Sequence, residues 1–417
     1  MKENEMSECI SIYVHIPFCE RKCNYCAFNS FCAEKDEIEK YIDLLCREIQ
    51  ARKTDKRVKT IYIGGGTPSI LSETQFEKIV KCLYDNFDIY EDAEFTIEAN
   101  PNSITEDKLL CWKKLRVNRV SIGVQSLSDK SLKKIGRLHT KKMALEKIKL
   151  TRKYFANVSC DLIVGLEGET GKDLCGYAHS LLDLKVKHIS CYLLEVYEAT
   201  ALHSMIANKK YMPLDDGQTI ESFNKLAKYL VEKGMERYEI SNFAFLSFES
   251  RHNLNYWARG EYLGFGLSAH SFVNGVRFEN VGSLQKYAEV FEKQDPSTLS
   301  IHCHVERSCD AKHPTQTDNL DVVPNISDEQ AQDDNKTELF EKVERLSQQE
   351  ENEEKIMLGM RCCLGFKISD LKNYDIEKNP YFSDYLKQGI IKKEGDIVTL
   401  NPLFYHLSNT IISNLLP

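Results

Sequence analysis

Six short segments rich in β-branched and aromatic residues alternate with amphipathic, helix-like segments through the first half of the chain. Strand–helix units in series predict a parallel sheet with helices packed on it. Six units fall short of the eight that close a full barrel, so we expect an open, partial (βα)6 barrel of the α/β class. The expected strands are Ile12–Ile16, Thr60–Ile63, Glu94–Ala99, Arg119–Gln125, Ser159–Gly165 and His188–Val196.

The segments around these strands carry helix signals of their own. The span 38–50 is amphipathic, and the span 72–87 opens with Ser72 and Gln75 at the spacing of a capping box. A longer helix is expected at 215–234. Beyond it, the pattern predicts a strand at 238–243 and a glycine-interrupted turn at 263–268.

Charge is distributed unevenly along the 417 residues, whose net charge is −8. The stretch 296–354 holds 15 acidic and 5 basic residues and a single aromatic, Phe340, so the rest of the chain is slightly basic. A segment of this composition cannot bury enough apolar surface to offset its ordering entropy. We therefore expect a mobile acidic insertion over 300–345, with helix near its end at 338–354.

The last 63 residues resemble a folded unit again. Helices are expected at 355–363, 368–374 and 381–388, followed by a hairpin over 390–401 that turns at Gly395, and by a final helix. This order predicts a winged-helix-like domain. It carries 8 basic against 6 acidic residues, so we expect packing or partner contact here, and no nucleic-acid binding by the acidic chain.

These patterns divide the chain into a barrel at 8–235, a barrel extension at 236–299, the acidic insertion at 300–345 and the winged-helix-like domain at 346–417. No run of 18 apolar residues occurs, and the polar start is unlike a secretory signal. We expect a cytoplasmic protein that is not integral to a membrane, with peripheral membrane contact left open. Its fifteen cysteines are then expected to be reduced.

The first expected strand leads into Cys19, Cys23 and Cys26, spaced C-x3-C-x2-C. Structural zinc usually takes four protein ligands. Three thiolates suit a cubane [4Fe–4S] cluster that leaves one iron open to another ligand. A zinc loop remains an alternative, and Cys32, which is off the spacing, is expected not to be a ligand.

With Tyr25 directly before the third cysteine, this loop resembles the cluster loop of radical S-adenosylmethionine (SAM) enzymes. A glycine run at 64–68 and polar residues at later strand ends extend the resemblance. It implies a [4Fe–4S] cluster on Cys19, Cys23 and Cys26, and SAM as the second cofactor. The residues that it implies for SAM binding are Tyr13, Tyr25, Gly65, Gly66, Thr67, Glu98, Gln125, Arg137 and Asp161.

The run Tyr13–Cys19 is similar to the opening of the oxygen-independent coproporphyrinogen III oxidase family, and the likeness covers all but the first ten residues and the acidic insertion. The decarboxylase branch of that family carries a fourth cysteine where Phe28 stands here. The segment 252–257, HNLNYW, resembles a motif of the heme chaperone (HemW-like) branch. The resemblance therefore implies a heme chaperone, with heme as cargo, acceptor hemoproteins as partners and His252 as a candidate heme contact.

Other functions remain open at this point. The main rival is oxidative decarboxylation of two propionates of coproporphyrinogen III to vinyls, because a non-ligand cysteine can be lost. The others are a heme-modifying or methyl-transferring radical enzyme and a zinc-dependent binding module. One further group of metal-binding residue types falls in the acidic insertion and is expected to be incidental: His302, Cys303, His304, Cys309 and His313.

Overall fold

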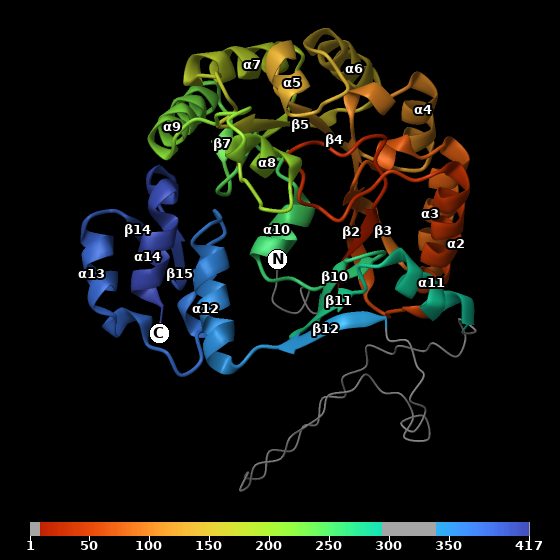
Figure 1. Ribbon diagram of the computed structural model, residues 1–417. Helices are drawn as coiled ribbons and strands as arrows, with labels where there is room; N and C mark the ends of the chain where they lie inside the picture. Colours follow the sequence, from red (N-terminus) through yellow and green to blue (C-terminus); the bar gives the residue numbers. More distant parts are fainter. Residues whose placement is uncertain (1–8, 294–338, 417) are drawn as a thin grey trace, which may run out of the picture.

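The computed structural model describes residues 9–293 and 339–416. Its larger unit is a twelve-stranded sheet that curves like an open barrel, with helices on its outer face (Figure 1). Six parallel strands follow one another in chain order within this sheet, which confirms the predicted partial barrel. These strands are β1 (Cys9–Ile16), β2 (Arg57–Gly65), β3 (Ile89–Ala99), β4 (Arg119–Gln125), β5 (Asn157–Val164) and β6 (His188–Leu193).

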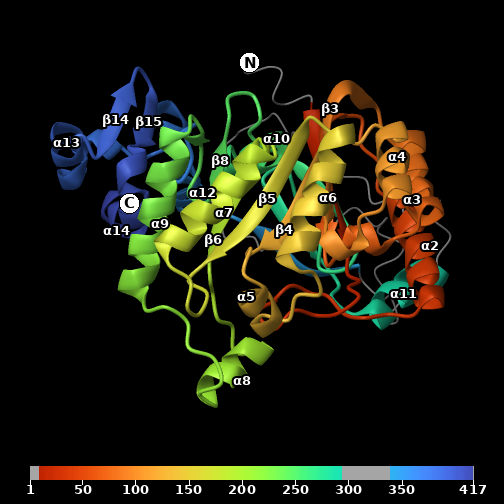
Figure 2. The ribbon, with the colours of Figure 1, turned by 90° about the horizontal axis from the view of Figure 1, so that it is seen from above.

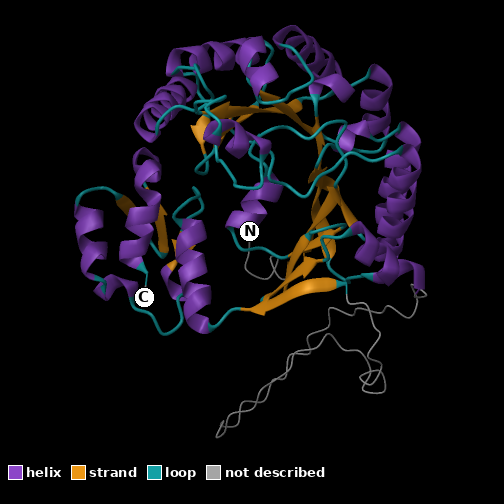
Figure 3. Cartoon of the chain, in the orientation of Figure 1, coloured by secondary structure: helices purple, strands orange, loops and turns teal. Residues whose placement is uncertain are grey.

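The helices that join these strands form the outer layer, while loops line the inner side and the rim (Figure 3). The predicted capping box starts α3, where Ser72 Oγ accepts from the Gln75 amide at 3.2 Å and Gln75 Oε1 accepts from the Ser72 amide at 3.0 Å. The joining helices are α2 (Lys35–Ala51), α3 (Glu73–Asn86), α4 (Glu106–Lys114), α5 (Asp129–Lys134), α6 (Lys141–Tyr154) and α7 (Gly171–Asp183). After β6 come α8 (Ala201–Ala207), which projects from the barrel (Figure 2), and α9 (Asp216–Glu232).

Further short strands extend the sheet at both edges of the barrel. Beside β6 lie β8 (Asn242–Ala244) and β7 (Glu236–Arg237), so the single strand predicted at 238–243 is wrong. The chain turns back between these two short strands, and Tyr238 N donates to Asn242 O at 3.2 Å across the turn. Inside the curve of the sheet lies α10 (Arg251–Trp257) (Figure 1).

At the other edge, β9 (Tyr262–Phe265) pairs parallel with β1, where the sequence predicted only a turn. Gly264 lies within this strand because β10 (His270–Val273) comes so close: a Cβ on Gly264 would stand 2.0 Å from the His270 carbonyl oxygen. β11 (Val276–Asn280) and α11 (Leu284–Lys293) follow.

The edge of the sheet is β12 (Phe340–Arg345), which pairs antiparallel with β11. The helix predicted at 338–354 is therefore wrong over its first half, and α12 (Gln348–Gly359) begins only after this strand. β12 forms because β11, more than 60 residues earlier, offers it a pairing edge, and strand preference depends strongly on such context. The His and Cys residues noted between 302 and 313 lie outside the described residues.

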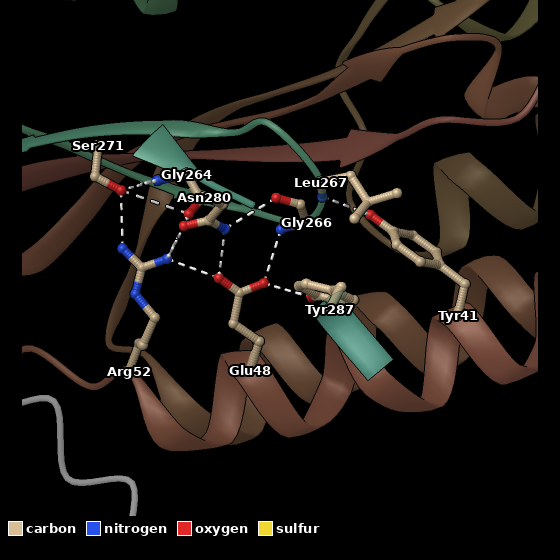
Figure 4. A network of polar contacts seen from close by, with 9 residues as sticks. All are labelled: Tyr41, Glu48, Arg52, Gly264, Gly266, Leu267, Ser271, Asn280 and Tyr287. Atoms are coloured by element: carbon tan, nitrogen blue, oxygen red, sulfur yellow. Dashed lines mark hydrogen bonds and ion pairs between the residues drawn. The ribbon is translucent and has the colours of Figure 1, made fainter. Parts of the chain in front are cut away.

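A buried polar network fastens α2 to this end of the sheet (Figure 4). Glu48 and Arg52 form an ion pair of 2.7 Å inside the protein. The Glu48 carboxylate also accepts from Gly266 N at 2.8 Å and from the Tyr287 hydroxyl, while Arg52 donates to the Gly264 carbonyl at 2.7 Å. Since buried charges need such partners, the network fixes where β9–β11 sit on α2.

The C-terminal unit has its own apolar core and a three-stranded sheet, as the winged-helix-like prediction requires. It docks on the barrel through main-chain contacts, such as Cys363 N to Tyr238 O at 2.8 Å, and through the ion pair of Arg277 with Glu354 at 2.7 Å. None of the described helices has the length and hydropathy of a membrane span. After α12, the C-terminal unit contains β13 (Phe366–Lys367), α13 (Pro380–Lys387), β14 (Ile391–Glu394), β15 (Ile397–Leu400) and α14 (Ser408–Leu415).

Candidate functional site

The three cysteines lie on the loop that follows β1, at the edge of the barrel where the parallel strands end. The base of the loop is closed by two main-chain hydrogen bonds, Cys19 N to Phe31 O and Phe31 N to Pro17 O, both 2.9 Å. Farther out, Asn24 N donates to Ile135 O at 3.0 Å. The loop is thus held at both its base and its tip, and every cysteine in the described part of the chain is a free thiol.

Each of the three sulfurs has a polar neighbour. Thr67 Oγ1 donates to Cys19 Sγ at 3.4 Å, Arg137 Nη1 donates to Cys23 Sγ at 3.5 Å, and Cys26 Sγ lies 3.8 Å from the Ser30 hydroxyl. Hydroxyl and guanidinium donors of this kind stabilise thiolates over thiols.

Cys32 differs from these three. It is exposed, and its thiol donates to the Glu20 main-chain carbonyl at 3.4 Å. That Cys32 is not a ligand stays a prediction.

The glycine run at the end of β2 lies close to this loop and leaves no space for side chains. A Cβ on Gly66 would stand 2.7 Å from the Phe18 carbonyl oxygen and 3.0 Å from Cys19 Sγ, so only glycine fits. Gly65 has φ +111° and packs against the His15 ring. His15 in turn accepts from the Tyr13 hydroxyl at 2.9 Å, which brings Tyr13 to the same place.

Glu98, at the end of β3, faces the glycine run. Its carboxylate accepts from Gly65 N at 3.2 Å and from the Tyr62 hydroxyl at 2.6 Å. Burial raises the pKa of Glu98 to about 7, although these two hydrogen bonds oppose the shift. Sequence analysis did not single out Tyr62. Only the alternation of side chains along β2, which turns residues 60, 62 and 64 to one face, could have indicated it.

Arg137 joins three parts of the site. One terminal nitrogen, Nη2, donates to Asn100 Oδ1 at 2.6 Å and to the Gly123 carbonyl at 2.5 Å, while Nη1 reaches Cys23. Asn100 Nδ2 donates on to Thr67 Oγ1 at 3.0 Å. A continuous polar chain therefore runs from Cys19 through Thr67, Asn100 and Arg137 to Cys23.

Three other residues expected at the site lie around this chain. Gln125 ends β4 with φ +64°, and its side-chain nitrogen covers Gly123. Asp161, on β5, accepts from the Ser121 hydroxyl at 3.4 Å, and burial raises its pKa. Tyr25 is packed against the small apolar cluster around Ile135, and burial raises its pKa as well. Asn100, which follows β3, is a second polar residue, after Tyr62, that the sequence analysis did not single out.

His252 is placed differently from what a heme contact needs. It lies on α10 with 1% of its surface exposed, its Nδ1 is 2.8 Å from Thr60 Oγ1 and its Nε2 is 2.8 Å from the Tyr256 hydroxyl. Burial lowers its pKa to about 3, so the imidazole is neutral. Since both nitrogens are engaged, this conformation offers none to a heme iron. Heme contact by His252 remains a prediction that requires one of these hydrogen bonds to break.

The donor set fits an iron–sulfur cube better than a single metal ion. Within residues 9–293 and 339–416, no three His, Cys, Asp or Glu side chains converge as they would around one ion. A cube bonds its thiolates at separate irons, so convergence on one point is not required. Three free thiols on a braced loop, next to a glycine run with no space for side chains, suit such a cluster and a second ligand beside it.

Comparison with known proteins also indicates a protein with an iron–sulfur cluster of the radical SAM type. The model of the radical SAM superfamily matches residues 13–181. The heme chaperone HemW of Bacillus subtilis is 36% identical over 292 residues, covering 68% of this chain and 76% of that protein. HemW of Escherichia coli is 35% identical over 270 residues, covering 63% and 70%.

Among solved structures, the radical SAM enzyme coproporphyrinogen III oxidase (HemN) of Escherichia coli matches with a TM-score of 0.74. The match covers 98% of this chain and 90% of that one at 19% identity. At this identity the likeness shows a shared fold, which includes the C-terminal unit.

Proposed function

The chain belongs to the HemW family of radical SAM proteins, and from this we propose that it is a heme chaperone that binds heme and passes it to acceptor hemoproteins. Its cluster would be held by Cys19, Cys23 and Cys26. SAM would lie against Gly65, Gly66 and the strand-end side chains described above.

The observation that favours a chaperone over a decarboxylase concerns the cysteine loop. Two residues beyond Cys26 stands Phe28, where the decarboxylase branch carries a fourth cysteine, and this side chain is 69% exposed. An exposed phenylalanine contributes nothing to the core of the barrel. Its side chain has no thiolate, so the loop lacks the fourth cysteine of the decarboxylase branch.

When bound, the cluster supplies an electron and an open iron for SAM. The chain's own contribution is positioning: Thr67 and Arg137 direct donors at two of the sulfurs, and Glu98 accepts from the main chain of the glycine run. Because Arg137 also holds Asn100 and Gly123, it fixes the strand ends relative to the loop.

The test is anaerobic reconstitution of the full chain with iron and sulfide, followed by two incubations. With heme, we expect a stoichiometric complex with a Soret band. With coproporphyrinogen III, SAM and reductant, we expect no protoporphyrinogen IX. Heme transfer is then checked by adding an apo-hemoprotein and following reconstitution of its spectrum.

Two outcomes of these incubations would contradict the chaperone proposal. Formation of protoporphyrinogen IX, with release of methionine and 5′-deoxyadenosine, would assign the chain to the decarboxylase branch instead. A preparation that carries an intact cluster but takes up no heme would also contradict the chaperone proposal.

A further inference from the structure

Away from the cysteine loop, two further thiols of the barrel lie in hydrogen-bonding contact with each other: Cys46, on α2, and Cys82, on α3. Cys362 and Cys363 are in similar contact, but they are neighbours in sequence. Across a trans peptide the Cα atoms of neighbours are about 3.8 Å apart, which is closer than the roughly 4.4 Å at which relaxed disulfides begin. The pair on two separate helices has no such restriction.

The two helices lie side by side on the outside of the barrel (Figure 1). Cys82 Sγ donates to the Cys46 carbonyl at 3.4 Å, and Asn86 Nδ2 donates to Cys82 Sγ at 3.8 Å. One turn away, Lys78 Nζ and the Asp43 carboxylate form an ion pair of 2.5 Å across the same seam. Both thiols therefore face one seam whose two sides are already fastened together.

A small reagent has access to this seam. Both cysteines line a surface pocket of about 430 Å³ between the helices, and each structure-bearing helix contributes one of them. The charged residues of the pocket are three basic ones, Arg47, Lys78 and Lys81, and two acidic ones, Asp43 and Asp85. This slight excess of positive charge favours an anionic reagent over a cationic one.

The two thiols differ in reactivity. The hydrogen bond between them lowers the pKa of Cys82 and raises the pKa of Cys46. Because the thiolate is the nucleophile in disulfide chemistry, Cys82 is the thiol that attacks first and Cys46 the one that resolves.

We propose that Cys46 and Cys82 are a modification site, at which exchange with a small anionic disulfide such as glutathione disulfide forms a reversible bond between α2 and α3. The Cys82 thiolate attacks one sulfur of glutathione disulfide, and the first glutathione leaves with the proton that Cys82 released. Cys46 then attacks Cys82 Sγ in this mixed disulfide, and the second glutathione leaves with the proton of Cys46. The two protein thiols lose two electrons, which reduce one glutathione disulfide to two glutathiones.

The bond would close the loop 46–82, which contains all of β2 and the glycine run. Such a link restricts the unfolded chain more than the native one. We therefore expect the oxidised protein to unfold at a higher temperature than the reduced protein. The cluster should be retained, since neither thiol belongs to the cysteine loop.

The test equilibrates the reconstituted full chain, without oxygen, in glutathione buffers of increasing disulfide content. The samples are then quenched in acid, alkylated and mapped by mass spectrometry, while absorbance follows the cluster. We expect the peptides of Cys46 and Cys82 to appear linked, with a mass lower by two hydrogen atoms than their reduced sum, and to separate with dithiothreitol. Cys111→Ser is the matched control, because it alters another half-buried thiol on the neighbouring α4, and it should leave this linkage unchanged.

Two variants test the order of attack. Cys46→Ser should trap Cys82 as its mixed disulfide with glutathione, and Cys82→Ser should leave Cys46 free to be alkylated. Neither variant should gain thermal stability on oxidation, whereas the unaltered chain should.

The outcomes are distinct. If both thiols of the unaltered chain are still alkylated at every glutathione ratio while the cluster is intact, the proposal is overturned, and this result does not depend on whether the variants fold. If the linked peptide forms but glutathione collects on Cys46 in Cys82→Ser, the order of attack is overturned. A thermal midpoint that falls on oxidation would overturn the stabilising role.

Discussion

The ring of Tyr62 lies 5.1 Å from the imidazole of His252, while its hydroxyl donates to Glu98 at 2.6 Å. One side chain on β2 therefore connects α10, inside the barrel, with the carboxylate that faces the glycine run. Glu94, on β3, strengthens the same connection, because its carboxylate accepts from His252 N at 3.0 Å. The motif on α10 thus supports the wall of the candidate SAM site.

Replacing any one of Cys19, Cys23 or Cys26 with alanine should abolish the [4Fe–4S] centre, because three thiolates are the whole ligand set on this loop. Iron analysis and Mössbauer spectroscopy of the reconstituted variants measure this. Cys32→Ala is the matched control and should keep a full cluster, since its exposed thiol donates only to a main-chain carbonyl. A complete cluster in any of the first three variants would refute the assignment.

His252→Ala should lower the free energy of unfolding by about 2–4 kcal/mol, through the cavity left and the Tyr256 hydroxyl, which loses its hydrogen bond to the imidazole. Urea unfolding at pH 7 measures the change. His270→Ala, on an exposed ring, should stay within about 0.5 kcal/mol. We expect the folded His252 variant to bind heme more weakly or with a shifted Soret band; unchanged heme affinity and spectrum would remove His252 as a heme contact.

Stability should depend on the ionisation of Glu98. Its pKa is raised from 4.5 to about 7 in the native state, so between these values the native chain holds a proton that the unfolded chain has released. Stability attributable to Glu98 is then fully present below pH 4.5 and decreases as pH rises to 7. Between pH 4.5 and 7, the free energy of unfolding of Glu98→Gln should therefore fall by roughly 1–2 kcal/mol less than that of the unaltered chain. The figure is discounted because Glu98 is only partly shielded from solvent.

The measurement is the difference between the two proteins in urea unfolding at pH 5 and at pH 8, without SAM. Taking the difference cancels the other titrating groups. A variant whose stability runs parallel to that of the unaltered chain would show that Glu98 is ionised throughout this range.

The effect on stability of deleting the acidic insertion should depend on where the deletion ends. Deleting 300–337 behind a short linker should leave cluster content and thermal stability nearly unchanged, because this acidic stretch has little apolar surface to bury. Extending the deletion to 341 should cost several kcal/mol, since it removes buried Leu339 and Phe340, whose ring lies 5.1 Å from that of Phe278. Thermal denaturation of both deletions, with equal linkers, compares them directly.

The elements that could be predicted were those whose signals are local. The six barrel strands, the capping box at Ser72 and the hairpin at Gly395 each depend on residues a few positions apart. β9 and β12 were missed because each depends on a partner far along the chain: β9 lies beside β1, and β12 beside β11. β9 is only four residues long and interrupted by Gly264, and β12 is mostly charged, so neither carries a periodic strand signal by itself.

The residues of the candidate site also fall into those with a local sequence signal and those without one. The cysteine spacing and the glycine run indicated a cofactor by themselves, because few other needs produce them. Tyr62 and Asn100 could not be singled out, since a tyrosine and an asparagine are common in any strand or loop and gain their role only when the strand ends come together. For His252 the motif gave the residue type but not its orientation, and the fold turned the ring inward.

The partners of the Glu48 carboxylate are synthesised at very different times. Glu48 leaves the ribosome early, but its hydrogen bond from Asn280 joins residues 232 positions apart. At translation rates of roughly 5–20 residues per second, that partner arrives about 10–50 s later. Until then the Glu48 carboxylate has only Arg52 of its own helix as a partner. The first helix of the barrel therefore reaches its final set of hydrogen bonds only after residues 264–287 have been synthesised.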